Sequence, residues 1–339
     1  MSRTKITIKD IAKAAGVSTT TVSLVLNNKP SRISKETREK ILKIAKDKKY
    51  IPNRLAVNLA KQTTDTFGMI IPDIGNVFFA ELCKGCEVEA RKAGYSLTFS
   101  SSNEYISTDL EYVDTMIANR VDGIIYVSSS STDSSTNQKI CQKIHNSQIP
   151  FVVVDRSINF PYAKSVLMDN EAGGYIATKH LLELGHHKIG CLTGPMQSDT
   201  SKKRLAGYKK ALNEFNISYD SSLIMEGNFQ IESGYECLSY MRGLGVTAIF
   251  CFNDMMALGV YKAARDYGLK IPRDISVVGY DDIFICDILD VPLTTVHQPA
   301  YSIGRYAVQT LLALIRKDKD VENIVLSPSL KVRASTRRL

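Results

Sequence analysis

The stretch TIKDIAKAAGVSTTTVS, residues 7–23, decides the fold of the first part of the chain. Thr7 followed three residues later by Asp10 has the form of a capping box, which begins a helix. Gly16 can take the left-handed conformation that ends a helix, and Ser18 can then cap a second one. Two short helices joined by so tight a turn predict a helix-turn-helix unit.

A third helix should complete this unit. Asn27 to Pro30 break the second helix, and Ser34 begins a further amphipathic stretch that runs to about Lys48. Apolar residues at helical spacing should close a small core between the second and third helices. The residues expected to face inward are Val22, Val25, Leu26, Ile41, Leu42, Ile44 and Ala45.

Positive charge is concentrated at the start of the chain. Residues 1–62 contain 15 Lys/Arg and 4 Asp/Glu, a net charge of +11, whereas residues 63–339 contain 28 basic and 31 acidic residues. This asymmetry predicts a polyanionic partner for the first sixty residues alone. Neither an apolar run of about eighteen residues nor a stretch resembling a signal peptide occurs, so we expect a cytoplasmic protein with no membrane contact.

The cysteines do not predict a metal or redox site. Cys83 and Cys86 form a C-x-x-C pair, but the pair lies in a stretch with helical spacing and no second pair completes a zinc site. Buried thiols are the expectation. The seven cysteines are Cys83, Cys86, Cys141, Cys191, Cys237, Cys251 and Cys286.

The first sixty residues resemble a known family. TIKDIA (7–12), AGVSTTTVS (15–23) and YIPNRLA (50–56) are similar to the head of the lactose-repressor (LacI/GalR) family of bacterial transcription regulators, nearer its ribose and purine repressor branch. The resemblance implies that the second helix enters the major groove of DNA. The contacts it implies in this unit are Thr7, Ser18, Thr19, Thr20, Ser23, Leu24 and Asn27.

Base reading would fall to Thr19, Thr20 and Leu24 in this resemblance. A threonine hydroxyl can donate or accept, and its methyl group can contact a thymine methyl. Many relatives have Arg or His at the position of Leu24. Leucine offers apolar contact only, so the base pair facing it cannot be inferred.

Residues 51–62 are expected to form a hinge helix. A segment of about nine residues is too short to hold a helix alone in water. The resemblance implies that two hinges from a dimer pair in the minor groove, where Leu59 separates a base step. A plain amphipathic linker is the alternative. The hinge residues expected at DNA are Asn53, Arg54, Ala56 and Leu59.

The rest of the chain alternates apolar strand runs with amphipathic helices. Strands are expected at 67–71, 96–100, 123–127, 151–154, 189–192, 248–252 and 276–279, and helices near 79–93, 107–119, 171–184, 203–215, 232–241, 254–266 and 300–316. This alternation predicts an α/β body of two doubly wound parallel-sheet halves with a ligand cleft between them.

The expected domains are a helix-turn-helix domain (1–50), a hinge helix (51–62) and an effector-binding and dimerisation domain (63–339). The N-terminal half of the last would comprise about 66–168 and 298–328, and the C-terminal half about 169–297 and 329–339. This body resembles the family's sensor domain and periplasmic sugar-binding proteins. The resemblance rests on VDGI (121–124), LGHHKIG (184–190), RLAGY (204–208), FND (252–254), VGYDD (278–282) and LTTV (293–296).

Polar and aromatic residues in or near these motifs are the candidate ligand contacts. Arg204 is expected to open a helix, and its guanidinium suits paired hydroxyls or a carboxylate. Carboxylate and amide groups past strand ends can match sugar hydroxyls, and aromatic rings can stack on a sugar or base. The candidates are Phe78, Asn103, Asp155, Arg204, Phe229, Asn253 and Asp281; for Asn103 and Asp155 a structural role is equally open.

The effector is expected to be a monosaccharide such as a pentose, with no other cofactor. Relatives that take purines place an arginine in the loop before Arg204, whereas this chain has Ser198-Asp199-Thr200-Ser201 there. Asn253 and Asp281 match sugar hydroxyls. The sequence leaves open whether the effector induces or co-represses.

The predicted function is a repressor-type DNA-binding regulator under allosteric control by this effector. An enzyme is the first rival, but the body contains no G-x-S-x-G, Walker or H-E-x-x-H motif. A secreted solute-binding protein is the second, but it would lack the basic head. No leucine heptads follow residue 331, so a homodimer on a pseudo-palindromic operator is expected.

Overall fold

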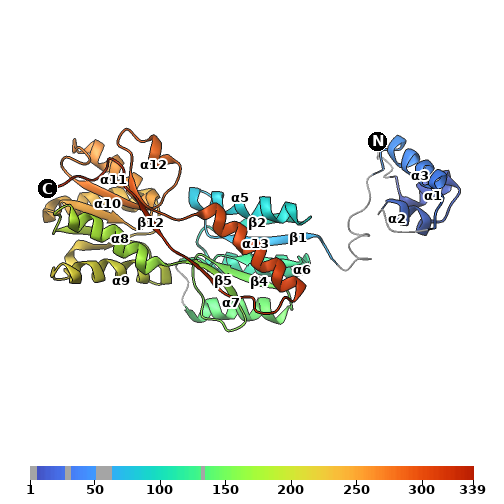
Figure 1. The fold of residues 1–339 in the computed structure, drawn as a ribbon, viewed down its shortest axis with the longest axis horizontal. Coiled ribbons are helices and arrows are strands. Elements are labelled where there is room, and N and C mark those ends of the chain that lie inside the picture. The colour runs from blue at the N-terminus through green and yellow to red at the C-terminus, as the bar shows by residue number, and fades with distance from the viewer. Residues whose placement is uncertain (1–5, 27–31, 51–62, 131–133) are drawn as a thin grey trace. The chain divides into compact units, whose positions relative to one another are not determined.

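The computed structural model describes residues 6–26, 32–50, 63–130 and 134–339 (Figure 1). Its contacts divide the chain into two compact units, residues 1–64 and 65–339. The first is helical and the second contains two six-stranded sheets. The predicted fold class, a helical head followed by an α/β body of two halves, is confirmed.

The described residues of the first unit form three helices: α1 (Ile8–Ala15), α2 (Thr19–Leu26) and α3 (Lys35–Asp47). The Asp10 carboxylate accepts hydrogen bonds from the backbone N–H and the hydroxyl of Thr7, both at 2.8 Å. Gly16 ends α1 with φ of 73°, and the Ser18 hydroxyl accepts from the Thr21 N–H at 3.0 Å. The turn chemistry in the sequence therefore forms the helix-turn-helix as predicted.

The core of this unit is small. Ser34 caps α3 by accepting from the Thr37 N–H at 3.2 Å. The prediction that Leu42 faces inward is wrong, because Ile41 and Ala45, one turn apart, occupy the inward face and leave Leu42 46% exposed. The buried residues are Ile11, Ala12, Ala15, Val22, Val25, Ile41 and Ala45.

The N-terminal half of the body is built on a parallel sheet in the order β11-β5-β4-β3-β1-β2. Its strands are β1 (Thr66–Ile71), β2 (Ser96–Ser101), β3 (Gly123–Tyr126), β4 (Phe151–Val154), β5 (Lys164–Met168) and β11 (Ile324–Leu326). Helices α5 (Val77–Lys92) and α13 (Ala300–Arg316) cover one face, and α6 (Ile106–Ala118) and α7 (Ser134–Asn146) the other (Figure 1). Both faces are buried, so the central strands are continuous apolar runs.

The C-terminal half repeats this plan in the order β12-β10-β9-β8-β6-β7, with only β12 antiparallel to its neighbour. Its strands are β6 (Ile189–Thr193), β7 (Ile224–Glu226), β8 (Ala248–Cys251), β9 (Ser276–Asp281), β10 (Thr294–His297) and β12 (Ser329–Lys331). Its main helices are α8 (Asn170–Glu183), α9 (Asp199–Glu214), α10 (Ile231–Met241) and α11 (Asp254–Asp266), with a short α12 (Ile285–Ile288). The chain passes between the halves after β5, after β10 and after β11.

The elements that sequence patterns missed are mostly short. β7, β11 and β12 have three residues each, too few for a periodic signal. α7 has the polar sequence SSTNQKICQKIHN and only a narrow apolar stripe. Helix α9 begins at Asp199 rather than near 203, so the prediction that Arg204 opens a helix is wrong: Arg204 lies in the second turn.

Glycines set the closest helix contacts in the body. A Cβ on Gly207 of α9 would lie 2.1 Å from the carbonyl oxygen of Glu171, and one on Gly174 of α8 would lie 2.1 Å from that of Arg204. These distances leave no room for a methyl group. The α8–α9 contact therefore fixes the backbone that carries Arg204.

We predict that Gly207→Ala destabilises the body by about 1–3 kcal/mol, because α8 and α9 must separate to admit the Cβ. The matched control is Gly243→Ala, where an added Cβ meets nothing within 4 Å. Urea unfolding followed by circular dichroism measures both. Equal stability of the two variants would contradict the close-packing argument.

Candidate effector site

A small cavity lies where the carboxyl ends of strands from both halves meet. Six of the seven predicted contact residues line it: Phe78, Asp155, Arg204, Phe229, Asn253 and Asp281. The seventh, Asn103, is exposed after β2 and is not among the lining residues. The sequence did not single out the other lining residues, which are Asn76, Phe79, Arg156, Thr200 and Gln298.

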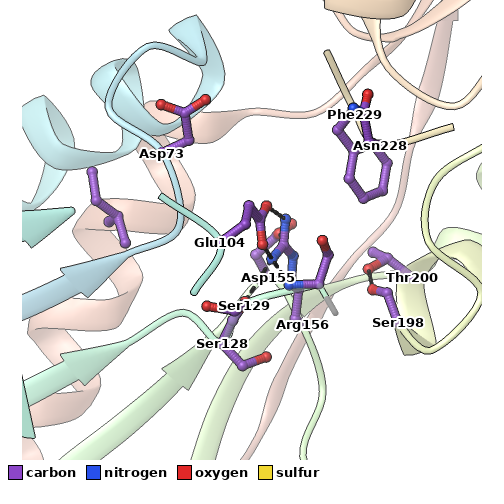
Figure 2. Close-up of polar contacts among 12 residues, drawn as sticks. Asp73, Glu104, Ser128, Ser129, Asp155, Arg156, Ser198, Thr200, Asn228 and Phe229 are labelled. Carbon is purple, nitrogen blue, oxygen red and sulfur yellow. Dashed lines mark hydrogen bonds and ion pairs between the residues drawn. The ribbon is translucent and has the colours of Figure 1, made fainter. Parts of the chain in front are cut away.

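Arg156 supplies the positive charge in the wall that the N-terminal half contributes to the cavity (Figure 2). Its two terminal nitrogens meet the Glu104 carboxylate at 2.9 and 3.0 Å, and Nη1 also donates to the Ser128 carbonyl at 2.6 Å. The guanidinium lies 5.7 Å from the ring centre of Phe79 and 5.6 Å from that of Phe229. Arg156 directly follows Asp155 after β4, so the strand-end rule that selected Asp155 could have found it.

In the Arg156–Glu104 pair the arginine is buried and the glutamate is partly buried, which sets the electrostatics of the pair. Burial alone would raise the pKa of Glu104, but the Arg156 charge and hydrogen bonds outweigh it and hold that pKa below its usual value. The Glu104 carboxylate also accepts from the Ser130 N–H at 2.5 Å. The charge of Arg156 is therefore matched within the N-terminal half.

Asp155 presents an unsatisfied acceptor to the cavity. Its backbone has φ of 66°, in the left-handed region. Its Oδ1 is buried and has no hydrogen-bond partner in the described part of the chain, while Oδ2 lies 3.9 Å from Arg156 Nε. Burial raises the pKa of Asp155, with Arg156 and Arg204 acting in the opposite direction.

Arg204 supplies the positive charge in the opposite wall, which the C-terminal half contributes. Its Nε donates to Asn170 Oδ1 at 2.8 Å and its Nη1 to the Phe252 carbonyl. The guanidinium carbon lies 3.5 Å from the ring centre of Tyr280. These contacts fix the side chain in one orientation.

Asp281 and Gln298 form a joined pair. Gln298 Nε2 donates to Asp281 Oδ1 at 2.6 Å, which leaves Gln298 Oε1 buried with no hydrogen-bond partner among the described residues. Burial raises the pKa of Asp281 well above its usual value, against the Arg204 charge. Gln298 lies on the crossover between β10 and α13, and the sequence gave no motif that marked it.

Asn253 positions other cavity residues. Its Oδ1 accepts from the Met256 N–H at 2.9 Å and caps α11, and its Nδ2 donates to the Phe229 carbonyl at 2.9 Å. Phe229 has φ of 66°, and its ring fills the space that a Cβ on Gly194 would occupy. The ring is thereby held against the cavity.

Two hydrogen bonds join the halves beside the cavity. Gln230 Nε2 donates to Asp73 Oδ2 at 3.0 Å, and the Ser157 hydroxyl donates to Asp199 Oδ2 at 2.5 Å. Asp73 and Ser157 follow strands of the N-terminal half, whereas Gln230 and Asp199 begin helices of the other. We call these two bonds the cleft bonds.

The structure places some of the predicted DNA contacts. Thr7, Ser18, Thr19 and Thr20 are exposed, and Ser23 and Leu24 are half-buried. The side chains of Thr7 and Ser18 also serve helix starts, as described above. Asn27, Asn53, Arg54, Ala56 and Leu59 lie outside the described residues.

The cysteines are buried free thiols, as expected from the sequence. Burial raises the pKa of Cys83 to about 11, and the Cys86 thiol donates to the Gly304 carbonyl at 3.3 Å. Within the described ranges, no group of three or more His, Cys, Asp or Glu side chains could hold a metal ion. None of the helices described is both long and apolar enough to cross a membrane.

Comparison with known proteins identifies both parts of the chain. Residues 7–53 match the family model "Bacterial regulatory proteins, lacI family", and residues 178–336 match "Periplasmic binding protein-like domain". The HTH-type transcriptional repressor PurR of Vibrio atlanticus (strain LGP32) is 38% identical over 337 residues, covering 98% of this chain and 99% of the relative.

Solved structures agree with these matches. The lac repressor dimer bound to operator and the anti-inducer ONPF superposes with a TM-score of 0.88 at 31% identity, covering 98% of this chain and 99% of that one. A LacI family transcriptional regulator from Enterococcus faecium with bound ribose superposes with a TM-score of 0.74 at 29% identity, covering 81% of this chain and 99% of that one.

A helix-turn-helix unit followed by a two-halved body with a cleft site defines a DNA-binding regulator that responds to a small molecule. The chain belongs to the lacI family of bacterial regulatory proteins, which confirms the resemblance found in its first residues. It is a DNA-binding transcription regulator of that family.

We predict that Glu104→Gln destabilises the body by roughly 3–5 kcal/mol, because it leaves the buried Arg156 charge unmatched. The wild-type carboxylate has a lowered pKa, so its contribution is present above the usual pKa of 4.5 and is lost as the pH falls. The difference between the two proteins should therefore narrow below that pH.

The matched control is Asp114→Asn, which removes the exposed pair with Lys143. It should cost less than about 1 kcal/mol. Urea unfolding across a pH series measures both variants. A pH-independent difference for Glu104→Gln would count against the charge argument.

Proposed function

We propose that this chain is a homodimeric repressor whose affinity for operator DNA is lowered by a pentose bound between the two halves, with ribose as the first candidate. The observation that carries the proposal is a pair of buried, unpartnered acceptors, Asp155 Oδ1 and Gln298 Oε1, at one cavity. A ligand with several hydroxyl groups can donate to both.

The chemistry of the walls favours a sugar. A buried acceptor without a donor costs free energy that a ligand hydroxyl recovers. A hydroxyl can at the same time accept from a guanidinium such as Arg204. The rings of Phe78, Phe79 and Phe229 offer flat apolar faces for the C–H surface of a sugar ring. The ribose bound to the Enterococcus faecium regulator supports this ligand class.

A purine is the second candidate, favoured by the name PurR of the curated relatives. Against it, the start of α9 before Arg204 carries Ser198 and Thr200, whose hydroxyls bond each other at 2.6 Å. A nucleobase would require a different set of partners there. Calorimetric titration with ribose, other pentoses and purine bases separates the two candidates.

A ligand bound in this cavity can affect DNA binding by the head through the crossover segments that join the two halves. Gln298 belongs to one crossover segment, so a ligand bonded to it stabilises one arrangement of the two halves. A change in their arrangement would alter the spacing of the two heads in a dimer. Coupling free energies of about 1–3 kcal/mol are typical, which shifts operator affinity roughly 5- to 150-fold.

We predict that the protein binds specifically to a pseudo-palindromic operator in the promoter region of its own gene. The affinity for this operator should fall steeply as the salt concentration rises, because the basic head neutralises DNA phosphates. Ribose should raise the dissociation constant roughly 5- to 150-fold. Mobility shift over a salt series, with and without ribose, measures both effects. A single half-site is the control for dimeric binding.

Two outcomes would contradict this. Binding that does not discriminate operator from random DNA would reject the regulator as proposed. Operator affinity unchanged by any pentose but changed by a purine base would reject the pentose and favour the second candidate.

The cleft bonds should stabilise the ligand-binding arrangement. We predict that Ser157→Ala combined with Gln230→Ala weakens ribose binding roughly tenfold, because two hydrogen bonds between the halves are lost. Neither residue is among those lining the cavity. The dose of ribose that releases operator should rise by a similar factor.

The matched control combines Ser147→Ala and Gln138→Ala, whose side chains bond backbone carbonyls within the N-terminal half. Calorimetry on both double variants measures the effect. Equal ribose affinity in the two would show that the cleft bonds do not contribute to closure.

A further inference from the structure

The charged groups around the effector cavity are predominantly acidic. Asp155 and Asp281 face two guanidinium groups, Arg156 and Arg204, and Glu104 lies directly behind Arg156. Three carboxyl groups therefore oppose two cations. Whether the cavity attracts or repels an anionic ligand depends on whether the charge and the N–H groups of either arginine are available to that ligand.

The hydrogen bonds of the Arg156 guanidinium are all to residues of the N-terminal half. Its two terminal nitrogens are bonded to Glu104 in a two-pronged pair, and one also donates to the Ser128 carbonyl. Its Nε lies 3.9 Å from Asp155. A phosphate group would have to displace a buried carboxylate to gain a comparable contact.

Arg204 is similarly engaged. Its Nε and Nη1 bond Asn170 and the Phe252 carbonyl, and its face lies on the Tyr280 ring. Its positive charge acts on both Asp155 and Asp281. One cation thus serves two carboxyl groups.

The amino end of α9, beside the cavity at Thr200, offers no vacant anion site either. Asp199 is its first residue, so a carboxylate already occupies the positive end of the helix. That carboxylate accepts from Ser157 and lies 2.8 Å from Lys203 Nζ.

A groove of about 900 Å³ adjoins the cavity and shares Phe78, Asp281 and Gln298 with it. Its other acidic lining residues are Glu81, which is paired with Lys84, and Asp282, which is bonded to His297 and Arg333. None of its lining residues, all in the described part of the chain, is Lys or Arg. A substituent that projects from the ligand into this groove would find no cation among the residues that line it.

We infer that the cavity admits the sugar only in uncharged form and rejects its phosphate esters, so that the repressor senses the sugar before phosphorylation. This inference rests on the proposed pentose effector. A phosphate dianion placed beside Asp155 or Asp281 would be repelled and would lose its hydration, and the one cation it could approach, Arg204, already shares its charge between these two carboxyl groups. A neutral hydroxyl at the same place donates to those carboxyl groups.

A preference for the uncharged sugar implies which classes of reaction release the ligand and which consume it. The reaction that consumes it is transfer of the terminal phosphoryl group of a nucleoside triphosphate to one of its hydroxyl groups, which loses its proton as the nucleoside diphosphate leaves. The sugar phosphate formed no longer binds. Hydrolysis of a glycosidic bond, with water as the nucleophile, releases the free sugar that binds. Phosphorolysis releases a sugar phosphate instead, which the repressor would not detect.

Isothermal titration calorimetry with the full-length chain tests this, because the protein has no tryptophan to report binding by fluorescence. The probes are D-ribose, ribose 5-phosphate and 5-O-methylribose. The methyl ether is the control for charge, because, like the phosphate, it cannot close to a six-membered ring through O5. We expect ribose 5-phosphate to bind at least about 100-fold more weakly than ribose and well below the methyl ether.

Protein variants supply a second measurement. Asp281→Asn removes one negative charge and should weaken ribose binding while lowering the preference for ribose over ribose 5-phosphate by about tenfold or more. Glu81→Gln, in the adjoining groove, should leave ribose affinity unchanged. Circular dichroism verifies that each variant is folded.

Each outcome bears on one claim. Ribose 5-phosphate binding within tenfold of ribose would overturn the charge inference and leave the pentose effector standing. If 5-O-methylribose lost as much affinity as ribose 5-phosphate, the exclusion would be due to size or ring form, and the charge inference would be overturned. An unchanged preference for ribose over ribose 5-phosphate in Asp281→Asn would overturn it in the same way. Absence of binding by every pentose would reject the proposed effector itself.

Discussion

The site depends on one constraint: charged groups buried between the two halves must be matched within the protein or by the ligand. Arg156 satisfies it inside the N-terminal half, where Glu104 holds both of its terminal nitrogens. Arg204 satisfies it only in part, since it faces both Asp155 and Asp281. The cavity therefore retains unmatched acceptors, and a ligand that donates hydrogen bonds without adding negative charge fits them best.

The same constraint connects the two halves of the body. The cavity takes residues from both halves, so no rearrangement of the halves leaves its hydrogen bonds unchanged. Gln298 strengthens this connection, because one of its amide atoms holds Asp281 while the other faces the cavity from a crossover segment. A ligand hydroxyl bonded to Gln298 is thus bonded to the part of the chain about which the halves move. Differential affinity for two arrangements, which allosteric control requires, follows from that placement.

Sequence patterns predicted what local chemistry and periodicity determine. The turn from Asp10 through Gly16 to Ser18, and the buried runs such as β4, are of this kind. Residues after strand ends were also predictable, which is why Asp155 and Asp281 were found. Arg156 and Gln298 also follow strands, so the same rule could have included them, but their partners lie 52 and 17 residues away and no local motif marked their roles. The start of α9 was missed because Asp199 pairs with Ser157 of the other half, a contact without a local signal.

Three cavity residues have backbone conformations that the rest of the body must maintain. Asp155 and Phe229 have φ of 66° and Asp281 has φ of 116°, none of which a non-glycine residue adopts readily. Phe229 is held by the Asn253 amide and Asp281 by Gln298. Asp155 follows a fully buried strand and Asp281 ends another, while Phe229 is bonded to Asn253, the capping residue of α11. These contacts supply the rigidity that unfavourable dihedrals need. The protein's own contacts therefore fix the walls of the cavity, which lowers the ordering cost that binding must meet.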